Sequence, residues 1–332
     1  MRRAFLGAVL GCVALLTLTG CSDSSGPLPG SNEGAAEADA STAELGAPFV
    51  GTWKLVAVER RSPDGEVLAT PTTDSLGYLM YDPAGYMGVV IQRADRQPYV
   101  GETRTPEEAL AALTSYTSYF GTYTVDEAAS TVTHHLEGSL NPSGAGSDYL
   151  RSYEFGSHTL TLQPPAGPSG VEVRLRWERV EDKADLSAEH RRFIGFWRFV
   201  KLERHTEDGE QLPVPGGFQN GFIIYTSSGD MAVHLMRPDR EPYTGPRPTA
   251  GEAEAAMSTY ASYFGPFTIH EEDGYVVHHR IGSTNPGTTG SDAQRFYELS
   301  DTHLILKPPP ATIDGARVQS SLTWERLTQE SR

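Results

Sequence analysis

The stretch VTHHLEGSLNP, residues 132–142, decides how this chain is organised, because it returns as VVHHRIGSTNP at residues 276–286. Val132, His134 and Leu136 are every second residue, which is the spacing of side chains on one face of a β-strand. The Asn-Pro pair that follows is a turn signal. A motif that recurs 144 residues later indicates two copies of one domain.

The same spacing links motifs along the whole chain. Gly51-Thr52-Trp53 pairs with Gly195-Phe196-Trp197, Asp95-Arg96 with Asp239-Arg240, Pro98-Tyr99 with Pro242-Tyr243, Ser118–Gly121 with Ser262–Gly265, and Ser147-Asp148 with Ser291-Asp292. Only the closing Trp177-Glu178-Arg179 is displaced, since it matches Trp324-Glu325-Arg326 at a spacing of 147. We therefore expect one domain at 47–182 and a second at 190–328.

Each copy reads as an all-β domain with one helix. In copy one, alternating segments at 51–60, 76–82, 86–93, 121–126, 130–137, 148–155, 158–163 and 171–179 predict eight strands joined mostly by short turns. Such a meander is expected to close into an antiparallel barrel, which removes its free edges. A capping threonine and Pro106 begin a helical pattern that runs through Leu113, Tyr116 and Phe120 to Gly121. That helix either plugs the barrel or packs outside it.

These residues carry a resemblance. Gly-x-Trp at the first strand, Tyr-Asp-x-x-Gly in a hairpin, Arg-x-Asp-Arg, the His-His pair and the closing Trp-Glu-Arg resemble the bacterial and fungal lipocalin-like domain family. The resemblance covers about 48–180 and 192–327, and copy two departs from it where Tyr225–Gly229 lacks the Asp and where Pro238 enters the arginine motif. It implies two tandem lipocalin-like barrels more strongly than any activity. It also implies that Arg179 packs on Trp53, and Arg326 on Trp197, as structural pairs.

The N-terminus predicts a membrane anchor. Arg2 and Arg3 precede an apolar run at 4–18 that is too short to span a bilayer. The run ends at Leu18-Thr19-Gly20-Cys21, which resembles a bacterial lipobox, so we expect a signal peptide at 1–20 and lipidation of Cys21. The alternative is an ordinary secretory signal with an incidental cysteine. Small acidic residues at 21–46 predict a disordered tether to a membrane of the cell envelope, which would be the outer membrane in a Gram-negative host.

The net charge and the cysteine content exclude several classes of partner and of catalytic site. The formal net charge is −16 and no basic cluster occurs, so nucleic acid is not expected as a partner. The two cysteines, Cys12 and Cys21, belong to the predicted signal and anchor, which leaves no thiol for catalysis or metal binding. There is no phosphate-binding glycine loop, Gly-x-Ser-x-Gly or HExxH, so we expect no cofactor and no metal.

Adjacent strand residues face opposite sides, so one histidine of each pair is expected to face inward and the two cannot chelate one ion. The candidate ligand contacts are His134, His278, Arg96, Arg240, Tyr119, Tyr263, Asn141 and Asn285. Alternation favours His134 in copy one, whereas in copy two alignment favours His278 and the neighbours Val277 and Ile281 favour His279. For each histidine, structural hydrogen bonding, ligand contact and proton transfer all remain open.

We expect an eight-stranded barrel of this kind to bind one small apolar or amphipathic ligand. An isomerase or cyclase that uses a histidine and a carboxylate in the cavity is the catalytic alternative. An envelope interaction module with filled barrels is the third possibility. Binding without catalysis is the preferred hypothesis.

Overall fold

The protein is described by a computed structural model over residues 46–331, apart from 73 and 215. The predicted signal peptide, Cys21 and nearly all of the predicted tether lie outside the described residues. No helix in the described part is long and apolar enough to cross a membrane.

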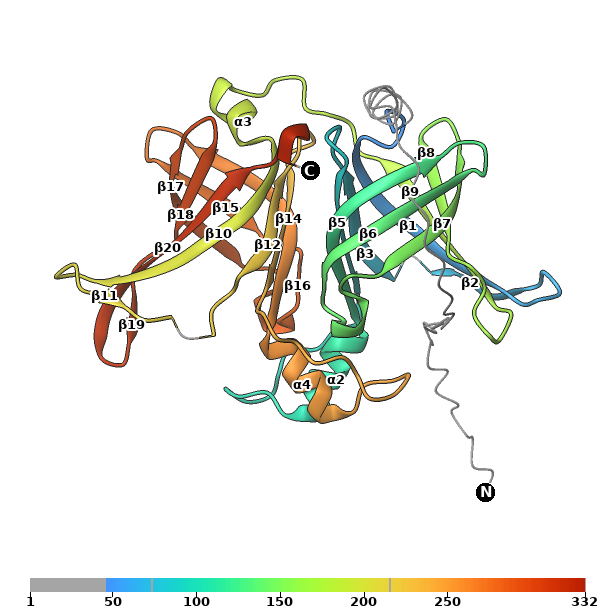
Figure 1. The fold of residues 1–332 in the computed structure, drawn as a ribbon, viewed down its shortest axis with the longest axis horizontal. Helices are drawn as coiled ribbons and strands as arrows, with labels where there is room; N and C mark the ends of the chain where they lie inside the picture. Colours follow the sequence, from blue (N-terminus) through green and yellow to red (C-terminus); the bar gives the residue numbers. More distant parts are fainter. Residues whose placement is uncertain (1–45, 73, 215, 332) are drawn as a thin grey trace, which may run out of the picture.

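The first copy forms an eight-stranded antiparallel barrel, here called barrel 1 (Figure 1). Its elements are β1 (Gly51–Arg61), β2 (Val67–Thr72), β3 (Ser75–Tyr81), β4 (Tyr86–Arg93), α2 (Pro106–Thr114), β5 (Tyr116–Asp126), β6 (Thr131–Ser139), the 3-10 turn η1 (Pro142–Gly144), β7 (Asp148–Phe155), β8 (Thr159–Gln163) and β9 (Glu172–Arg179). Pairing of β1 with β9 closes the barrel, and β2 only extends the far end of β1 as a hairpin.

The second copy, barrel 2, repeats this arrangement after the short helix α3 (Ala188–Phe193). Its elements are β10 (Gly195–Thr206), β11 (Gln211–Leu212), β12 (Asn220–Tyr225), β13 (Asp230–Met236), α4 (Ala250–Ser258), β14 (Tyr260–His270), β15 (Tyr275–His279), β16 (Gly282–Ser283), η2 (Pro286–Thr288), β17 (Asp292–Leu299), β18 (His303–Lys307), β19 (Ala311–Ile313), β20 (Ala316–Arg326) and η3 (Gln329–Ser331). Pairing of β10 with β20 closes it. The prediction of an all-β fold with two tandem barrels is confirmed.

The inserted helices are shorter than their sequence pattern predicts. Helix α2 ends at Thr114, and Tyr116 and Phe120 belong to strand β5 instead. A spacing of four places residues on one side of a helix, but it also places them on one face of a strand, so periodicity alone could not separate the two. The same correction applies to Tyr260 and Phe264 in β14.

The two barrels share an apolar core where their outer walls meet. Strands β3 and β4 of barrel 1 and β12 and β13 of barrel 2 are buried along nearly their whole length, on both faces. One face lines the barrel and the other packs on the opposite barrel, which is why runs such as Tyr78–Tyr81 and Phe222–Tyr225 are continuously apolar. These continuous apolar runs are the signal in the sequence for this contact.

A polar cluster lies at the centre of this contact. Ser118 Oγ donates to Ser262 Oγ at 3.0 Å, and these two serines occupy equivalent positions in the two copies. Tyr260 lies 3.0 Å from Ser118, and Tyr116 lies 3.2 Å from Ser262, with each pair joined by hydroxyl oxygens. The contact is thus approximately twofold symmetric within one chain, as in a symmetric dimer.

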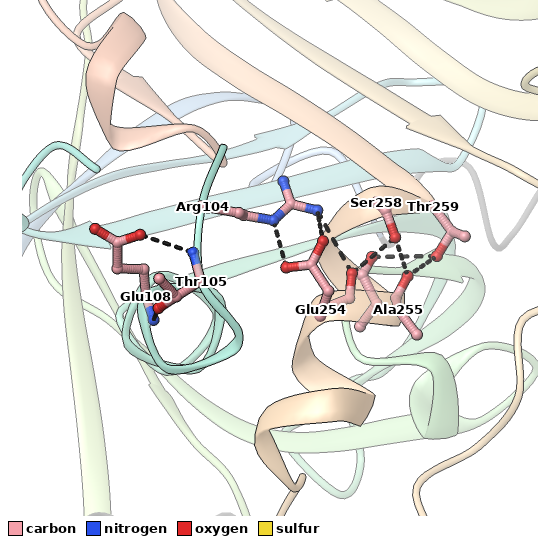
Figure 2. Close-up of polar contacts among 8 residues, drawn as sticks. Arg104, Thr105, Glu108, Glu254, Ala255, Ser258 and Thr259 are labelled. Atoms are coloured by element: carbon pink, nitrogen blue, oxygen red, sulfur yellow. Dashed lines mark hydrogen bonds and ion pairs between the residues drawn. The ribbon is translucent and has the colours of Figure 1, made fainter. Parts of the chain in front are cut away.

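Helices α2 and α4 contact each other at one end of this interface (Figure 1). Arg104, just before α2, donates from Nε to the Glu254 carboxylate of α4 at 2.8 Å, while Glu108 bonds the Thr105 backbone in the α2 capping box (Figure 2). The helices therefore pack outside the barrels, against each other, and plug neither barrel.

Candidate functional site

His134 lies inside barrel 1, between two tyrosines. It is 1% exposed, and its Nε2 lies 2.7 Å from Tyr81 Oη on β3 while its Nδ1 lies 3.1 Å from Tyr119 Oη on β5. Strand β6 places it there because alternate residues of this strand are buried among the barrel's aromatic side chains. Both ring nitrogens are therefore engaged within the barrel wall.

His278 has the same surroundings in barrel 2. Its Nε2 lies 2.8 Å from Tyr225 Oη and its Nδ1 lies 2.9 Å from Tyr263 Oη. Val276 and His278 are fully buried, so the alternation of Val277, His279 and Ile281 points to the wrong residue. Strand β15 ends at His279, so Ile281 lies outside the strand and does not indicate which of its faces is buried.

Burial keeps both inner histidines neutral. It lowers the pKa of His134 well below its ordinary value, and the nearby Arg151 lowers this pKa further. Burial, followed by Arg295, lowers the pKa of His278 in the same way. Burial also raises the pKa of Tyr81 and Tyr225. A neutral imidazole between two neutral phenols is a hydrogen-bonded structural element, and a ligand role for His134, His278, Tyr119 and Tyr263 stays a prediction.

The second histidine of each pair faces outward. His135 Nδ1 lies 2.7 Å from an Asp148 carboxylate oxygen, and its Nε2 lies 2.9 Å from Thr124 Oγ1. His279 makes the same contacts with Asp292 and Thr268. The histidine-carboxylate pairs thus lie on the exposed wall, whereas the buried histidines have tyrosine partners. The cavity pairing that the isomerase or cyclase hypothesis requires is not formed by these residues.

The Asp-Arg-x-Pro-Tyr motif predicts Arg96 and Arg240 at a barrel mouth, but both lie between the barrels. Arg96 donates from Nη2 to the carbonyl oxygen of Thr284 at 2.9 Å, and it also reaches that of Ser283. Arg240 donates in the same way to the carbonyl oxygens of Leu140, at 2.6 Å, and of Ser139. Burial lowers the pKa of both guanidinium groups. Their donors are directed at backbone carbonyls, which makes them interface residues.

Asn141 and Asn285 cap short turns. The side-chain oxygen of Asn141 accepts from Ser143 N at 3.0 Å, and that of Asn285 accepts from Gly287 N at 3.0 Å. Each thereby begins a 3-10 turn with proline at its first position. The structure gives these asparagines a local backbone role, and ligand contact stays a prediction.

The Trp-Arg pairs close one end of each barrel. The Arg179 guanidinium lies 4.5 Å from the centre of the Trp53 ring and donates to the carbonyl oxygens of Val50 and Pro48 at 2.8 Å each. Arg326 lies 3.9 Å from Trp197 and donates to Ile194 O at 2.7 Å. The contacts agree with the structural reading of all four residues.

A cavity at the opposite, open end of barrel 2 was missed by the sequence analysis. Its volume is about 210 Å³, and it is lined by Leu202, Arg204, Val214, Gly217, Phe218 and Arg237. Leu202 and Phe218 pack on the core inside barrel 2, so the cavity continues the barrel interior outward. Arg204 shares the inward face of β10 with Leu202. The signal in the sequence is that Phe218 and Val214 are apolar residues within a loop.

A larger hollow of about 580 Å³ lies on the outer wall of barrel 2. It is lined by residues of β10, β18 and β20 whose side chains point away from the barrel interior. Most of its lining residues are of polar type, and Val200 and Ile305 are the two apolar ones. Among the described residues, no group of three or more histidine, cysteine, aspartate or glutamate side chains is placed to hold a metal ion.

Comparison with known proteins gives one clear match. A family model described as a lipocalin-like domain matches residues 50–180 and again residues 194–327. No curated protein sequence matches the chain.

Two solved structures are among those that match most of this chain. A protein of unknown function of the DUF3598 family from Nostoc punctiforme is 10% identical, with a TM-score of 0.24 over 86% of this chain and 99% of that one. A transferrin binding protein B mutant from Haemophilus parasuis is 6% identical, with a TM-score of 0.22 over 83% of this chain and 75% of that one.

Proposed function

This chain belongs to the lipocalin-like domain family, and we propose from that premise that it binds a small amphipathic ligand at the open end of barrel 2. The cavity there carries the proposal, because it joins the apolar barrel core to solvent. Small-molecule sites are commonly concave, mostly apolar, and supplied with a few polar groups that orient the ligand.

Barrel 1 would serve mainly as the structural partner of barrel 2. Asp74 of barrel 1 stands where Phe218 lines the cavity of barrel 2, and Arg60, the counterpart of Arg204, is exposed. Aromatic rings fill the core around the inner histidine in both barrels, with Phe49 and Tyr81 of barrel 1 and Phe193 and Tyr225 of barrel 2 in T-shaped contact, so the ligand site is proposed at the end of barrel 2 and not beside either histidine.

We further propose that the protein acts from a membrane of the cell envelope, held there by lipid on Cys21. The lipobox-like Leu18–Cys21 and the acidic segment that follows it support this location. A tether of about 25 residues has a root-mean-square reach of about 25–30 Å, which would let the barrels sample a layer close to the membrane.

Binding of octyl compounds to the purified protein, measured by isothermal titration calorimetry, tests the ligand proposal. Val214→Trp places a large ring in the cavity and is expected to abolish binding. Val100→Trp is the matched control, because Val100 is 98% exposed and is not one of the residues that line the cavity. Saturable binding that survives Val214→Trp would place the ligand elsewhere, and the absence of any binding would refute the proposal.

A further inference from the structure

We propose that the cavity of barrel 2 selects ligands with an anionic head group, which Arg204 and Arg237 bind while the apolar part of the ligand packs on Leu202 and Phe218. The inference rests on the proposed function and specifies the chemical class of its ligand.

The first support is an unpaired donor. Arg204 lies on the inward face of β10, and its Nε is buried without a hydrogen-bond partner among the described residues. A buried donor left unpaired costs about 1–3 kcal/mol, and the cost is greater for a charged group. An anionic oxygen in the cavity would bind this N–H with a charge-assisted hydrogen bond.

The second support is the charge of the cavity lining. Arg237 follows the end of β13, and its guanidinium lies 5.9 Å from the centre of the Phe218 ring. The lining thus contains two guanidinium groups and no carboxylate. Two nearby positive charges at an apolar cavity repel each other and attract an anion.

The third support comes from barrel 1, which serves as an internal comparison. By the repeat spacing, Arg60 and Arg93 are the counterparts of Arg204 and Arg237, and Asp74 stands in the place of Phe218. Arg60 is exposed, whereas Arg204 is half-buried. At these equivalent positions the apolar wall and the half-buried arginine are found in barrel 2 and not in barrel 1, although barrel 1 has a buried, unpaired Nε elsewhere, on Arg174 of β9.

Arg93 also differs from Arg237 in its partner. Arg93 makes two hydrogen bonds to the Asp95 carboxylate, at 2.9 and 2.6 Å, and this carboxylate raises the pKa of Arg93. In the described residues the equivalent Arg237–Asp239 ion pair is not formed, and Asp239 has a left-handed φ of 55°. Arg237 is thereby left available for an external anion.

The cavity volume sets the size of the ligand. At about 210 Å³ it is smaller than the roughly 300–1,000 Å³ of sites that hold drug-sized molecules. A short chain with one charged end suits it better than a long-chain lipid, which would extend into solvent.

Matched eight-carbon probes test the inference. Octanoate, octanol and octyltrimethylammonium share one chain and differ in the head group, and acetate supplies the anion alone. Calorimetric titration of the whole protein is expected to show octanoate binding at least tenfold more tightly than the other two octyl compounds. Acetate alone is expected to bind far more weakly than octanoate.

Variants assign the preference to residues. Arg204→Met and Arg237→Met are each expected to reduce octanoate affinity about tenfold and to leave octanol unchanged. The barrel 1 counterparts, Arg60→Met and Arg93→Met, are the controls and should bind as wild type does. If circular dichroism shows that Arg204→Met does not fold, Arg204→Lys replaces it. This variant keeps the positive charge and is expected to retain a weaker preference for an anionic ligand.

The two proposals fail in different ways. Equal affinity for all three octyl compounds, or a preference for octanoate that survives both arginine substitutions, would overturn anion selection and leave ligand binding intact. Acetate binding as tightly as octanoate would show a site for free anions and overturn the amphipathic ligand. If no octyl compound binds, both the proposed function and this inference are wrong.

Discussion

Arg96 in barrel 1 and Arg240 in barrel 2 reach across the interface in reciprocal fashion, each donating to backbone carbonyls of the other barrel. Arg96 binds Ser283 and Thr284, while Arg240 binds Ser139 and Leu140, which are the equivalent positions of the repeat. A contact in which each half presents the same surface is typical of symmetric dimers, and here one chain provides both halves.

Removing one of these arginines should therefore destabilise the whole molecule. Arg240→Ala leaves the Ser139 and Leu140 carbonyls without their guanidinium donor in a largely buried contact, and we expect a loss of about 2–5 kcal/mol in the free energy of unfolding. Urea denaturation measures it. Arg93→Ala is the control, since Arg93 is exposed and pairs only locally, and it should cost about 0.5 kcal/mol or less. An Arg240→Ala variant as stable as this control would refute the interface role.

The shared core predicts that the barrels unfold together. The repeat alone suggests two independent folding units, but Phe120 and Phe264 pack in one apolar cluster with residues of both copies. Phe120→Ala should cost about 3–5 kcal/mol. Intrinsic fluorescence, with two tryptophans in each barrel, should still show one transition. A second transition at the wild-type midpoint would indicate that barrel 2 folds alone.

Gly51 is expected to tolerate no side chain. Its φ is 128°, and a Cβ there would lie 2.7 Å from the Arg179 guanidinium, which is held in place by two carbonyls and Trp53. Gly51→Ala should lower the free energy of unfolding by about 2–4 kcal/mol through backbone strain and loss of the cation-π contact. Gly65→Ala is the matched control, because its φ is 84° and no atom lies near its Cβ, so only about 1 kcal/mol of strain is expected. Equal costs at the two positions would exclude the contribution of Arg179.

Stability is expected to fall in acid because of the buried histidines. Burial lowers the pKa of His134 and His278 well below the ordinary value. A third buried histidine, His234 of β13, lies 2.9 Å from Ser118 in the contact between the barrels, and burial lowers its pKa to about 3. Their neutral forms stabilise the fold fully above pH of about 6.5, and below it the unfolded chain binds protons that the folded chain does not. Each histidine should then lower the free energy of unfolding by about 1.4 kcal/mol for every pH unit below this value, until the pH reaches the pKa of that histidine in the folded protein.

Urea denaturation between pH 6 and 4.5 would measure this slope. His134→Gln and His278→Gln should each reduce it by the share of one histidine, and the double variant by twice as much. A slope that is the same in wild type and in the double variant would contradict the assignment.

The lipid anchor is tested by Cys21→Ala. We expect this variant to leave the membrane fraction or to accumulate as unprocessed precursor, since lipidation requires the thiol. Fractionation followed by immunoblotting measures both outcomes. A variant that is processed and still membrane-bound would show that Cys21 is not the lipidated residue.

The sequence by itself determined the class of fold, the repeat and the closed ends of the barrels. The resemblance to the lipocalin-like family, carried by the Gly-x-Trp and Trp-Glu-Arg motifs, implied that Arg179 packs on Trp53, and the structure places it there. Strand alternation fixes which residues share a face, and the repeat identifies equivalent positions in the two copies. These relationships depend on local periodicity and on repetition, both of which are readable along the chain.

Only the tertiary structure decided how the two barrels meet and where a ligand could enter. From the sequence, Arg96 and Arg240 are candidate ligand contacts, because their acceptors are carbonyl oxygens of the other barrel, 187 and 101 residues away. The cavity likewise gathers Arg204, Phe218 and Arg237 from three separate segments. Contacts between residues distant in sequence depend on packing and have no periodic signature in the chain, so their partners appear only when the barrels are assembled.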